Sequence, residues 1–553
     1  MLETIFQYSL LSFLLSIVLL LIVLVKTQVK IWQIWLLAIG LTYPGAVIAN
    51  HLGAQIILSI LVLLGIFLIP SIRLLIFTKP LFNSMRKSLP PIGLTERIAL
   101  EAGSVWWDAE LFQGNPNWKQ LSDLEATELS DEEQSFVDNE VETLCSMINS
   151  YDIIANQDLP KEVWKYIFDK GFLGLIIPKE FNGLGFSHFA HAIIVGRLSS
   201  ASQFLGISVM VPNSLGPGEL LLKYGTDDQK QYYLPRLAKG KEIPCFGLTS
   251  TVAGSDAGSL TDNGIVCYGE HEGNEVLGLR LNWEKRYITL APIATVIGLA
   301  FKAYDPDNLL PVDHPLHEKN DLGITCALIP RNTKGLSIGT RHRPIGEPFQ
   351  NGPIYGKDVF IPMDWIIGGD KMIGHGWRML MESLSVGRGI SLPVTGASAT
   401  QAMLLTTSTY SQTREQFGIP IANMEGIQEK LSNLATNAFR ATANINLSTW
   451  ALDAGHRPSI ISAIVKYRNT QLLQQSSIDA MDIHGGRAVM QGKRNYVANV
   501  YAGAPVAITV EGANILTRSL MIFGQGLIRC HKTMLNELNA LHDDSKNSLK
   551  NFK

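Results

Sequence analysis

The first 77 residues contain three long apolar stretches, and these restrict the possible folds more than any other feature of the chain. The first, 5–25, carries no charged residue, and the others cover 31–49 and 56–77. About 20 apolar residues are enough to cross a bilayer as a helix, and a segment inside lipid must satisfy its backbone polar groups internally. The sequence therefore predicts an anchor of two or three transmembrane helices over 1–77.

Basic residues flank these stretches unevenly. Lys26 and Lys30 lie between the first and second stretches, whereas only His51 lies between the second and third. Five basic residues begin near the end of the third: Arg73, Lys79, Arg86, Lys87 and Arg97. Because cytoplasmic flanks carry an excess of Lys and Arg, three crossings would place the N-terminus outside and the remaining chain in the cytoplasm. Pro70 weakens the third stretch, so two crossings with a third interfacial segment remain an alternative.

The overall composition argues against several classes of partner and site. A formal net charge of −3 gives no bulk electrostatic reason to expect a nucleic-acid partner. The five cysteines are scattered and never form a Cys-x-x-Cys pair, which disfavours a disulfide framework or a zinc site and favours a reducing compartment. No metal site is predicted. A chain of 553 residues exceeds one hydrophobic core, so several structural units are expected.

Changes in residue pattern divide the chain after the anchor. Helical apolar spacing begins with a capping box at Ser130 and Glu133, gives way to short β-branched runs, and returns in long stretches interrupted at Pro393, Pro420, Pro458 and Pro505. The fold class predicted is α+β. The expected segments are an anchor (1–77), a membrane-proximal connector (78–129), a helical domain (130–241), a β-domain (242–370), a helical bundle (371–541) and a polar tail (542–553).

A loop of small residues follows an apolar run at 245–258 (CFGLTSTVAGSDAG). Its Thr and Ser hydroxyls and unshielded backbone N–H groups suit close contact with a phosphate or a flat polar ring system. Hydrogen bonds from such hydroxyls to the nitrogens of a redox ring raise its electron affinity. Taken alone, the pattern is also compatible with an ordinary Gly/Ser turn.

Glu511 is the only charged residue between 502 and 516. An ionised carboxylate is costly in an apolar environment unless it has a task there. Desolvation raises the pKa of a carboxyl and makes it a better base near neutral pH. Glu511 is therefore the strongest candidate for a general base in this chain.

These two segments, with 285–289 (KRYIT), 414–418 (REQFG) and 482–486 (DIHGG) in the same order, resemble the acyl-CoA dehydrogenase family. The resemblance runs from about Trp106 to Arg529. It implies a helical domain, a middle β-domain and a C-terminal helical bundle, with FAD as cofactor and a flavin site shared between subunits. The transmembrane stretches and the run 511–518 (EGANILTR) look most like the membrane-associated FadE-type enzyme of bacterial fatty-acid β-oxidation. That type continues into a long C-terminal region, whereas this chain ends 42 residues after Glu511.

The resemblance also implies the roles of individual residues. Thr249 would lie near the redox-active edge of the flavin, and Tyr287 takes the position of the family's tryptophan. The expected cofactor contacts are Phe246, Leu248, Thr249, Ser255, Tyr287, Thr289, Arg414, Phe417, Gln428, Gly485, Gly486 and Asn514. Arg414 and Gln428 belong to the segment that reaches the flavin of a neighbouring subunit.

The remaining implied roles concern the acyl-CoA substrate. Glu511 would take the α-proton, and its backbone N–H would polarise the thioester with a flavin ribityl hydroxyl. Ser255, Arg388 and Gly512 would contact the substrate. The family pattern Glu-Gly-Thr-Ser reads Glu-Gly-Ala-Asn here, so the Asn514 amide would replace part of the lost hydroxyl chemistry. Some family members carry the base just before the arginine, but Gly387 occupies that position here.

The function implied is FAD-dependent α,β-dehydrogenation of fatty acyl-CoA to trans-2-enoyl-CoA. Electrons would pass to an electron-transfer flavoprotein, and the protein would be a homodimer or higher oligomer at a bacterial inner membrane with its catalytic part cytoplasmic. Two alternatives stay open at this point: an acyl-CoA oxidase that uses oxygen, and a catalytically inactive membrane-bound scaffold that binds acyl-CoA. The acyl chain length is not specified by the sequence.

Overall fold

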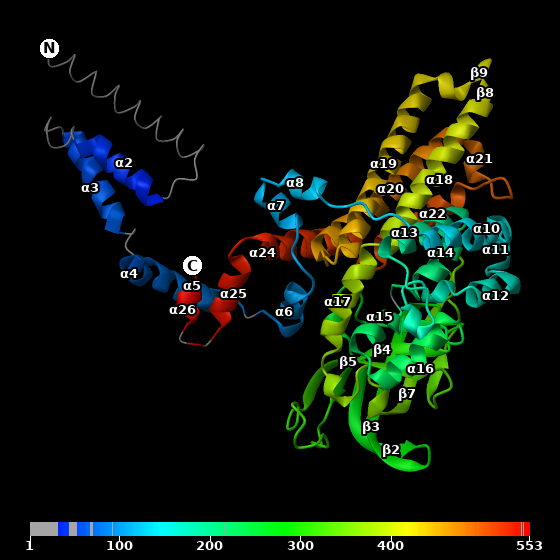
Figure 1. Ribbon diagram of the computed structural model, residues 1–553, viewed down its shortest axis with the longest axis horizontal. Helices are drawn as coiled ribbons and strands as arrows, with labels where there is room; N and C mark the ends of the chain where they lie inside the picture. The colour runs from blue at the N-terminus through cyan, green and yellow to red at the C-terminus, as the bar shows by residue number, and fades with distance from the viewer. Residues whose placement is uncertain are drawn as a thin grey trace. The chain divides into compact units, whose positions relative to one another are not determined.

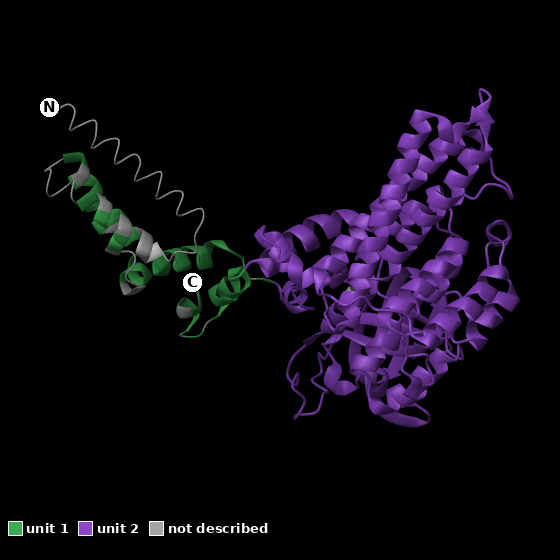
Figure 2. Cartoon of the chain, turned by 45° about the horizontal axis from the view of Figure 1, so that its top comes forward, with its two compact units in different colours: residues 1–92, 532–553 green, residues 93–531 purple. Residues whose placement is uncertain are grey.

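The structure is a computed structural model that describes residues 31–43, 52–66, 70–90, 92–214, 216–543, 545 and 547–552 (Figure 1). The chain divides into two compact units (Figure 2). One comprises residues 1–92 together with 532–553, and the other comprises residues 93–531. The ends of the chain therefore belong to the same unit.

The smaller unit is helical in its described part. Trp35 Nε1 of one helix donates to Leu61 O of the next at 2.6 Å, and the rings of Phe82 and Phe552 meet edge to face at 5.3 Å between centroids. The second contact brings the C-terminal helices onto the basic helix after the apolar stretches. The elements are α2 (Ile31–Tyr43), α3 (Leu52–Ile66), α4 (Pro70–Arg73), the π-helix η2 (Leu74–Thr78), α5 (Lys79–Ser88), α25 (Met534–His542) and α26 (Ser548–Asn551).

The predicted membrane stretches are only partly described. The stretch 5–25 lies outside the described residues, and parts of the other two form α2 and α3, which are 13 and 15 residues long. Among the described residues, no single helix has both the length and the hydropathy needed to cross a bilayer. Two helical stretches near the C-terminus, Ala498–Thr509 and Asn514–Cys530, meet those criteria only as a pair with a 49° bend.

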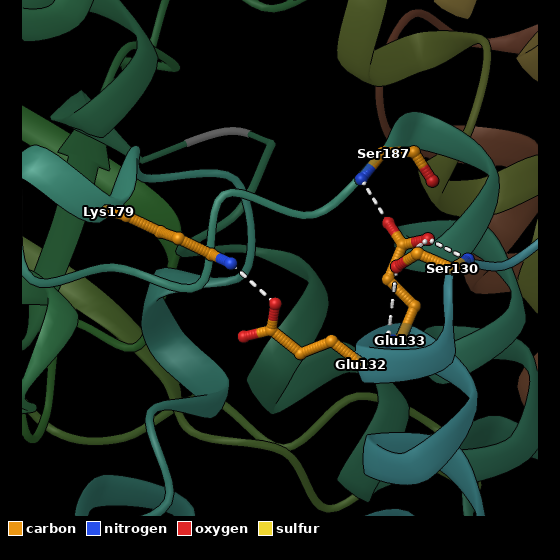
Figure 3. Close-up of polar contacts among 5 residues, drawn as sticks. All are labelled: Ser130, Glu132, Glu133, Lys179 and Ser187. Carbon is orange, nitrogen blue, oxygen red and sulfur yellow. Dashed lines mark hydrogen bonds and ion pairs between the residues drawn. The ribbon is translucent and has the colours of Figure 1, made fainter.

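The larger unit begins with short helices. The capping box expected at Ser130 is present: Glu133 N donates to Ser130 Oγ at 3.3 Å, and Ser130 N donates to Glu133 Oε2 at 2.8 Å (Figure 3). The other oxygen of Glu133 accepts a bond from Ser187 N at 2.7 Å, which joins this helix start to the next long helix. Lys179 pairs with Glu132 beside it. One carboxylate thus satisfies the ends of two helices.

The helices of this part are α6 (Leu94–Glu101), α7 (Asp108–Gln113), α8 (Trp118–Ser122), α9 (Asp131–Phe136), η3 (Val137–Val141), α10 (Glu142–Ser146), α11 (Ser150–Asn156), α12 (Lys161–Asp169), η4 (Phe172–Gly174), η5 (Lys179–Phe181), α13 (His188–Ala201), α14 (Gln203–Met210), α15 (Pro217–Tyr224) and α16 (Asp227–Ala238).

A seven-stranded sheet follows, as the short β-branched runs predict. Its order is β1-β4-β2-β3-β7-β6, with β5 paired to the outer side of β4. β4 runs parallel to β1 and β2, and the other pairs are antiparallel. The strands are β1 (Pro244–Gly247), β2 (Asn263–His271), β3 (Asn274–Thr289), β4 (Val296–Tyr304), β5 (Asp321–Pro330), β6 (Leu336–Ile338) and β7 (Asn351–Pro362). Three short 3₁₀ turns accompany them: η6 (Ala257–Ser259), η7 (Met363–Trp365) and η8 (Asp370–Met372).

The C-terminal part is a helical bundle whose three long helices lie side by side in Figure 1. These are α18 (Ser391–Thr413), α19 (Glu425–Asp453) and α20 (Ser459–His484). Close approach of α18 and α20 depends on a glycine, because a Cβ at Gly396 would lie 3.0 Å from Asn469 O. The others are α17 (Gly376–Arg388), α21 (Gly486–Val489), α22 (Ala498–Thr509), α23 (Asn514–Leu516), the π-helix η10 (Thr517–Gln525) and α24 (Gly526–Cys530), with the hairpin β8 (Glu415–Gln416) and β9 (Ile419–Pro420) leading into η9 (Ile421–Asn423).

The expected proline interruptions hold at two of four positions. Pro458 immediately precedes α20 and Pro420 ends β9. Pro393 lies in the first turn of α18, where its missing N–H breaks no intrahelical bond. The prediction is wrong at Pro505, which lies inside α22. Buried small residues on that helix pack against the bundle, and this packing outweighs the one backbone hydrogen bond that proline removes.

Candidate active site

Glu511 lies in the short loop between α22 and α23, and its backbone is left-handed. Its φ is +54° and that of Gly512 is +87°, so two consecutive residues occupy a region that side chains disfavour. Arg388 Nε at the end of α17 donates to Glu511 O at 3.1 Å. Lys466 Nζ from the first third of α20 donates to Gly512 O at 2.8 Å, and Thr517 Oγ1 donates to the same oxygen at 3.1 Å. Three side chains therefore hold the carbonyls of this strained loop.

The carboxyl group of Glu511 is buried and unpartnered. The residue as a whole is half-buried, but neither of its carboxyl oxygens is accessible or accepts a hydrogen bond from any residue that the structure describes. Burial raises the pKa of Glu511 to about 7, although the positive charges of Lys466 and Arg388 act in the opposite direction. Both protonation states are therefore populated near neutral pH, which suits a group that accepts and later releases a proton.

Burial also shifts the pKa values of the two cations near Glu511, which are Lys466 and Arg388. Burial lowers the pKa of Lys466 to about 8, with Glu511 raising it and Arg388 lowering it further. Burial also lowers the pKa of Arg388, which nevertheless stays charged because a guanidinium keeps its proton in proteins. The backbone N–H of Glu511 donates to no acceptor in the described part of the chain. It is thus available to a substrate carbonyl.

The loop predicted to contact the flavin continues directly from β1. Lys285 Nζ, on β3, donates to Leu248 O at 2.9 Å and to Asp262 Oδ2 at 2.6 Å, and both side chains of this ion pair are buried. Burial lowers the pKa of Lys285, and Asp262 opposes that shift. Arg286 N donates to Thr249 O at 3.1 Å. The carbonyls at the start of the loop are therefore fixed by β3.

Residues 254–256 of the loop are exposed. Ser255 is exposed, and a Cβ at Gly254 would meet no heavy atom within 4 Å. Phe246 is half-buried and covers Gly298 of β4, whose Cβ would lie 2.4 Å from the Phe246 ring. A loop with fixed carbonyls, exposed hydroxyls and free space fits the polar face of a bound FAD.

Tyr287 stands out at the far end of β3. The pairing of β3 with β7 is irregular between Lys285 and Ile288, and Tyr287 has a φ of +61° with 59% of its surface exposed. The guanidinium of Arg286 and the ring of His342 each lie 5.1 Å from its ring centroid. Asn351 Nδ2 donates to Tyr287 O at 3.1 Å and lies 3.5 Å from Thr289 Oγ1. The ring of Tyr287 is therefore open on one side, as the expected contact with the flavin requires.

Five other predicted cofactor residues lie at the end of the bundle away from the sheet: Arg414, Phe417, Gln428, Gly485 and Gly486. Phe417 is 95% exposed at the tip of the β8–β9 hairpin, and Arg414 and Gln428 are exposed beside it. A Cβ at Gly485 or Gly486 would meet no heavy atom within 4 Å. Figure 1 shows this hairpin at the end of α18 and α19 away from the sheet. Within one chain these residues do not join the loop after β1, so their cofactor contacts remain predictions.

Asn514 is engaged within the chain. Its Oδ1 accepts from Lys466 Nζ at 2.9 Å, and its Nδ2 donates to Thr470 Oγ1 at 2.9 Å. The sequence missed Lys466, His342 and Asp262 as site residues. Of these, only Asp262 had a signal in the sequence, because its partner Lys285 begins the segment 285–289 that contains Tyr287.

Three domain descriptions of one family match the larger unit in order. The N-terminal, middle and C-terminal domains of acyl-CoA dehydrogenase match residues 123–241, 245–359 and 374–522. The chain belongs to the acyl-CoA dehydrogenase family. It is a flavin-dependent oxidoreductase, and its cofactor is FAD.

Relatives of this chain are named for different reactions. The chain is 28% identical over 398 residues to a 3-(aryl)acrylate reductase of Clostridium sporogenes, covering 72% of this chain and 96% of the relative. It is 26% identical over 364 residues to the CarC subunit of the caffeyl-CoA reductase–Etf complex of Acetobacterium woodii, covering 65% and 87%. The fold matches butyryl-CoA dehydrogenase from Megasphaera elsdenii with a TM-score of 0.63 at 21% identity, covering 73% of this chain and all of that one.

Proposed function

We propose that this protein removes the α and β hydrogens of fatty acyl-CoA thioesters and produces trans-2-enoyl-CoA. The observation that carries the proposal is the buried carboxyl of Glu511, which has no hydrogen-bond partner in the described structure and a pKa raised to about 7. A group that must take a proton from carbon needs basicity near the working pH and lone pairs that are not already engaged.

In the proposed reaction the α-proton passes to a carboxyl oxygen of Glu511, the β-hydrogen leaves with its electron pair, and the C=C bond forms between the two carbons. FAD, when bound, accepts that hydride. The backbone N–H of Glu511 donates to the thioester oxygen and stabilises charge that develops there. Arg388 and Lys466 hold the two carbonyls of the loop, so the base and this donor stay aligned. Ser255 and Gly512 complete the proposed substrate contacts.

The proposal extends to two partners, the electron acceptor and a second copy of this chain. One relative is named as a subunit of a caffeyl-CoA reductase–Etf complex, which supports an electron-transfer flavoprotein as the proposed acceptor. The separation of the β8–β9 hairpin from the loop after β1 supports a flavin site completed by a second subunit. Each cofactor would then contact Arg414, Phe417 and Gln428 of the neighbouring copy.

We further propose a membrane-anchored FadE-type enzyme whose catalytic part faces the cytoplasm of a bacterium. The apolar sequences of α2 and α3 and the basic residues after them support this arrangement. Long acyl-CoA substrates partition to membranes, which suits an anchored enzyme.

The test is turnover by detergent-purified protein with palmitoyl-CoA, followed by mass spectrometry of the product. We expect trans-2-enoyl-CoA that forms only when an electron acceptor is added, with little hydrogen peroxide in air. Peroxide formed in proportion to product would indicate an oxidase. Tight binding of acyl-CoA without product, over chain lengths from 4 to 18 carbons, would indicate the scaffold and refute the enzyme.

A further inference from the structure

Lys466 is a fully buried lysine whose hydrogen bonds all go to neutral groups. Lys466 is 0% exposed, and Nζ donates to Gly512 O and Asn514 Oδ1 at 2.8 and 2.9 Å. It bonds to neither oxygen of Glu511, whose charge it nevertheless feels. A buried lysine is costly unless its charge acts on something nearby. Its position beside the proposed base therefore calls for a functional explanation.

Asn514 and Thr470 complete a closed hydrogen-bonded ring around this lysine. Asn514 accepts from Lys466 and donates to Thr470 Oγ1, which in turn donates to Lys466 O at 2.9 Å. Asn514 is also where this chain departs from the family pattern. The ring joins the first half of α20 to the loop that carries Glu511, and each of its bonds has an ordinary hydrogen-bond length of 2.9 Å.

The hydrogen-bonded ring fixes the position of the Lys466 ammonium group. A lysine free to turn would pair with the nearest carboxylate, and such a pair would depress the pKa of Glu511 and occupy its lone pairs. Held by Gly512 O and Asn514 Oδ1, the ammonium supports the ionised base through space but donates no hydrogen bond to it. Among the described residues, Arg388 from α17 is the other charge that acts on Glu511, and its Nε donates to Glu511 O.

We propose that Lys466 is a positioning residue for the dehydrogenation reaction and that Asn514 holds it away from the carboxyl of Glu511. This inference rests on the proposed function. It assigns to Asn514 a role in placing a cation, in addition to the cofactor contact that the resemblance implies. Removing the donor of the Lys466–Asn514 hydrogen bond and removing its acceptor should therefore shift the pH dependence of kcat/KM in opposite directions.

The test is the pH profile of kcat/KM for wild type, Lys466→Met and Asn514→Leu. Methionine keeps the length of lysine but removes the positive charge that favours ionised Glu511. The acidic limb of the profile, where kcat/KM rises as Glu511 ionises, is therefore expected to move to higher pH by about one unit. Leucine keeps the shape of asparagine but removes the oxygen that accepts from Lys466. Lys466 is then expected to pair with Glu511, which moves the acidic limb to lower pH and lowers the maximum kcat/KM. Arg468→Met removes an exposed charge from the same helix and is expected to leave the limb in place.

The outcomes separate this inference from the function on which it rests. A wild-type protein that makes no enoyl-CoA refutes the proposed function itself. An active wild type whose Lys466→Met variant loses rate equally at every pH assigns the lysine a structural role and overturns the inference. If Lys466→Met fails to retain flavin, Asn514→Leu decides alone, since an unmoved or raised limb in that variant contradicts the proposal.

Discussion

The buried ion pair between Lys285 and Asp262 gives a sharp prediction about the loop after β1. Lys285→Met leaves the Asp262 carboxylate buried without its counter-ion, because the side chains are only 0% and 3% exposed and 2.6 Å apart. It also leaves Leu248 O without its donor. Breaking one partner of a buried pair costs about 3–5 kcal/mol of unfolding free energy. Lys119→Met is the matched control, because its pair with Asp123 is exposed and contributes less than about 1 kcal/mol.

The double variant Lys285→Met/Asp262→Leu separates charge from packing. Replacing both charges removes the desolvation penalty, so the remaining cost is that of hydrogen bonds lost at Leu248 O and at Glu284 N, which donates to Asp262 Oδ1 at 2.9 Å. At about 1 kcal/mol for each bond, the double variant should be less stable than wild type by roughly 2 kcal/mol and more stable than Lys285→Met.

The measurement is urea unfolding of the holoprotein followed by far-UV circular dichroism, with the flavin content of each variant determined in parallel. Because Lys285 fixes the carbonyl of Leu248, Lys285→Met should also retain less FAD than the control. A cost below about 1 kcal/mol for Lys285→Met would refute the reasoning. So would a double variant that is less stable than the single one.

Three further predictions concern other buried groups. Burial raises the pKa of Glu347 to about 8, so the folded protein keeps a proton that the unfolded chain loses above about pH 4.5. Stability is therefore full below that pH and falls as pH rises through 8, and Glu347→Gln should raise the thermal midpoint at pH 7.5 but not at pH 4.5; an equal gain at both would contradict this. Gly512→Ala forces an alanine to a φ of +87° with its Cβ 3.3 Å from Thr517 Oγ1, so it should cost about 1–2 kcal/mol and lower kcat while FAD stays bound; an unchanged kcat would count against a strained loop. The kcat/KM of wild type should rise through an acidic limb near pH 7, where Glu511 ionises, and stopped-flow reduction from pH 5.5 to 9 would show a limb near 4.5 instead if the carboxyl were solvated.

The sequence predicted the helix–sheet–helix order of the larger unit because each of these parts carries a local signal, whereas the membrane anchor stays a prediction. The capping box at Ser130 and the β-branched runs of the sheet depend on neighbours within a few residues, and both are present. Pro505 shows where local rules fail, since packing of α22 against the bundle overrides the helix-breaking tendency of proline.

The candidate site was predicted only in part. Glu511 is conspicuous as a lone carboxylate in an apolar run, whereas Lys466 is a single lysine on a helix and its partners lie 46 and 48 residues away. The three side-chain contacts that hold the carbonyls of the Glu511 loop end on backbone atoms, which no residue pattern reveals. The left-handed backbone of Glu511 and Tyr287 is likewise set by the tertiary structure.

The most direct test of the account is an anaerobic titration of the purified protein with palmitoyl-CoA, following flavin absorbance in wild type and in Glu511→Gln. The account predicts that the wild-type flavin bleaches and that the Glu511→Gln flavin stays oxidised although the variant binds FAD and acyl-CoA. Bleaching of Glu511→Gln at the wild-type rate would show that another group takes the α-proton. That result would contradict the central claim.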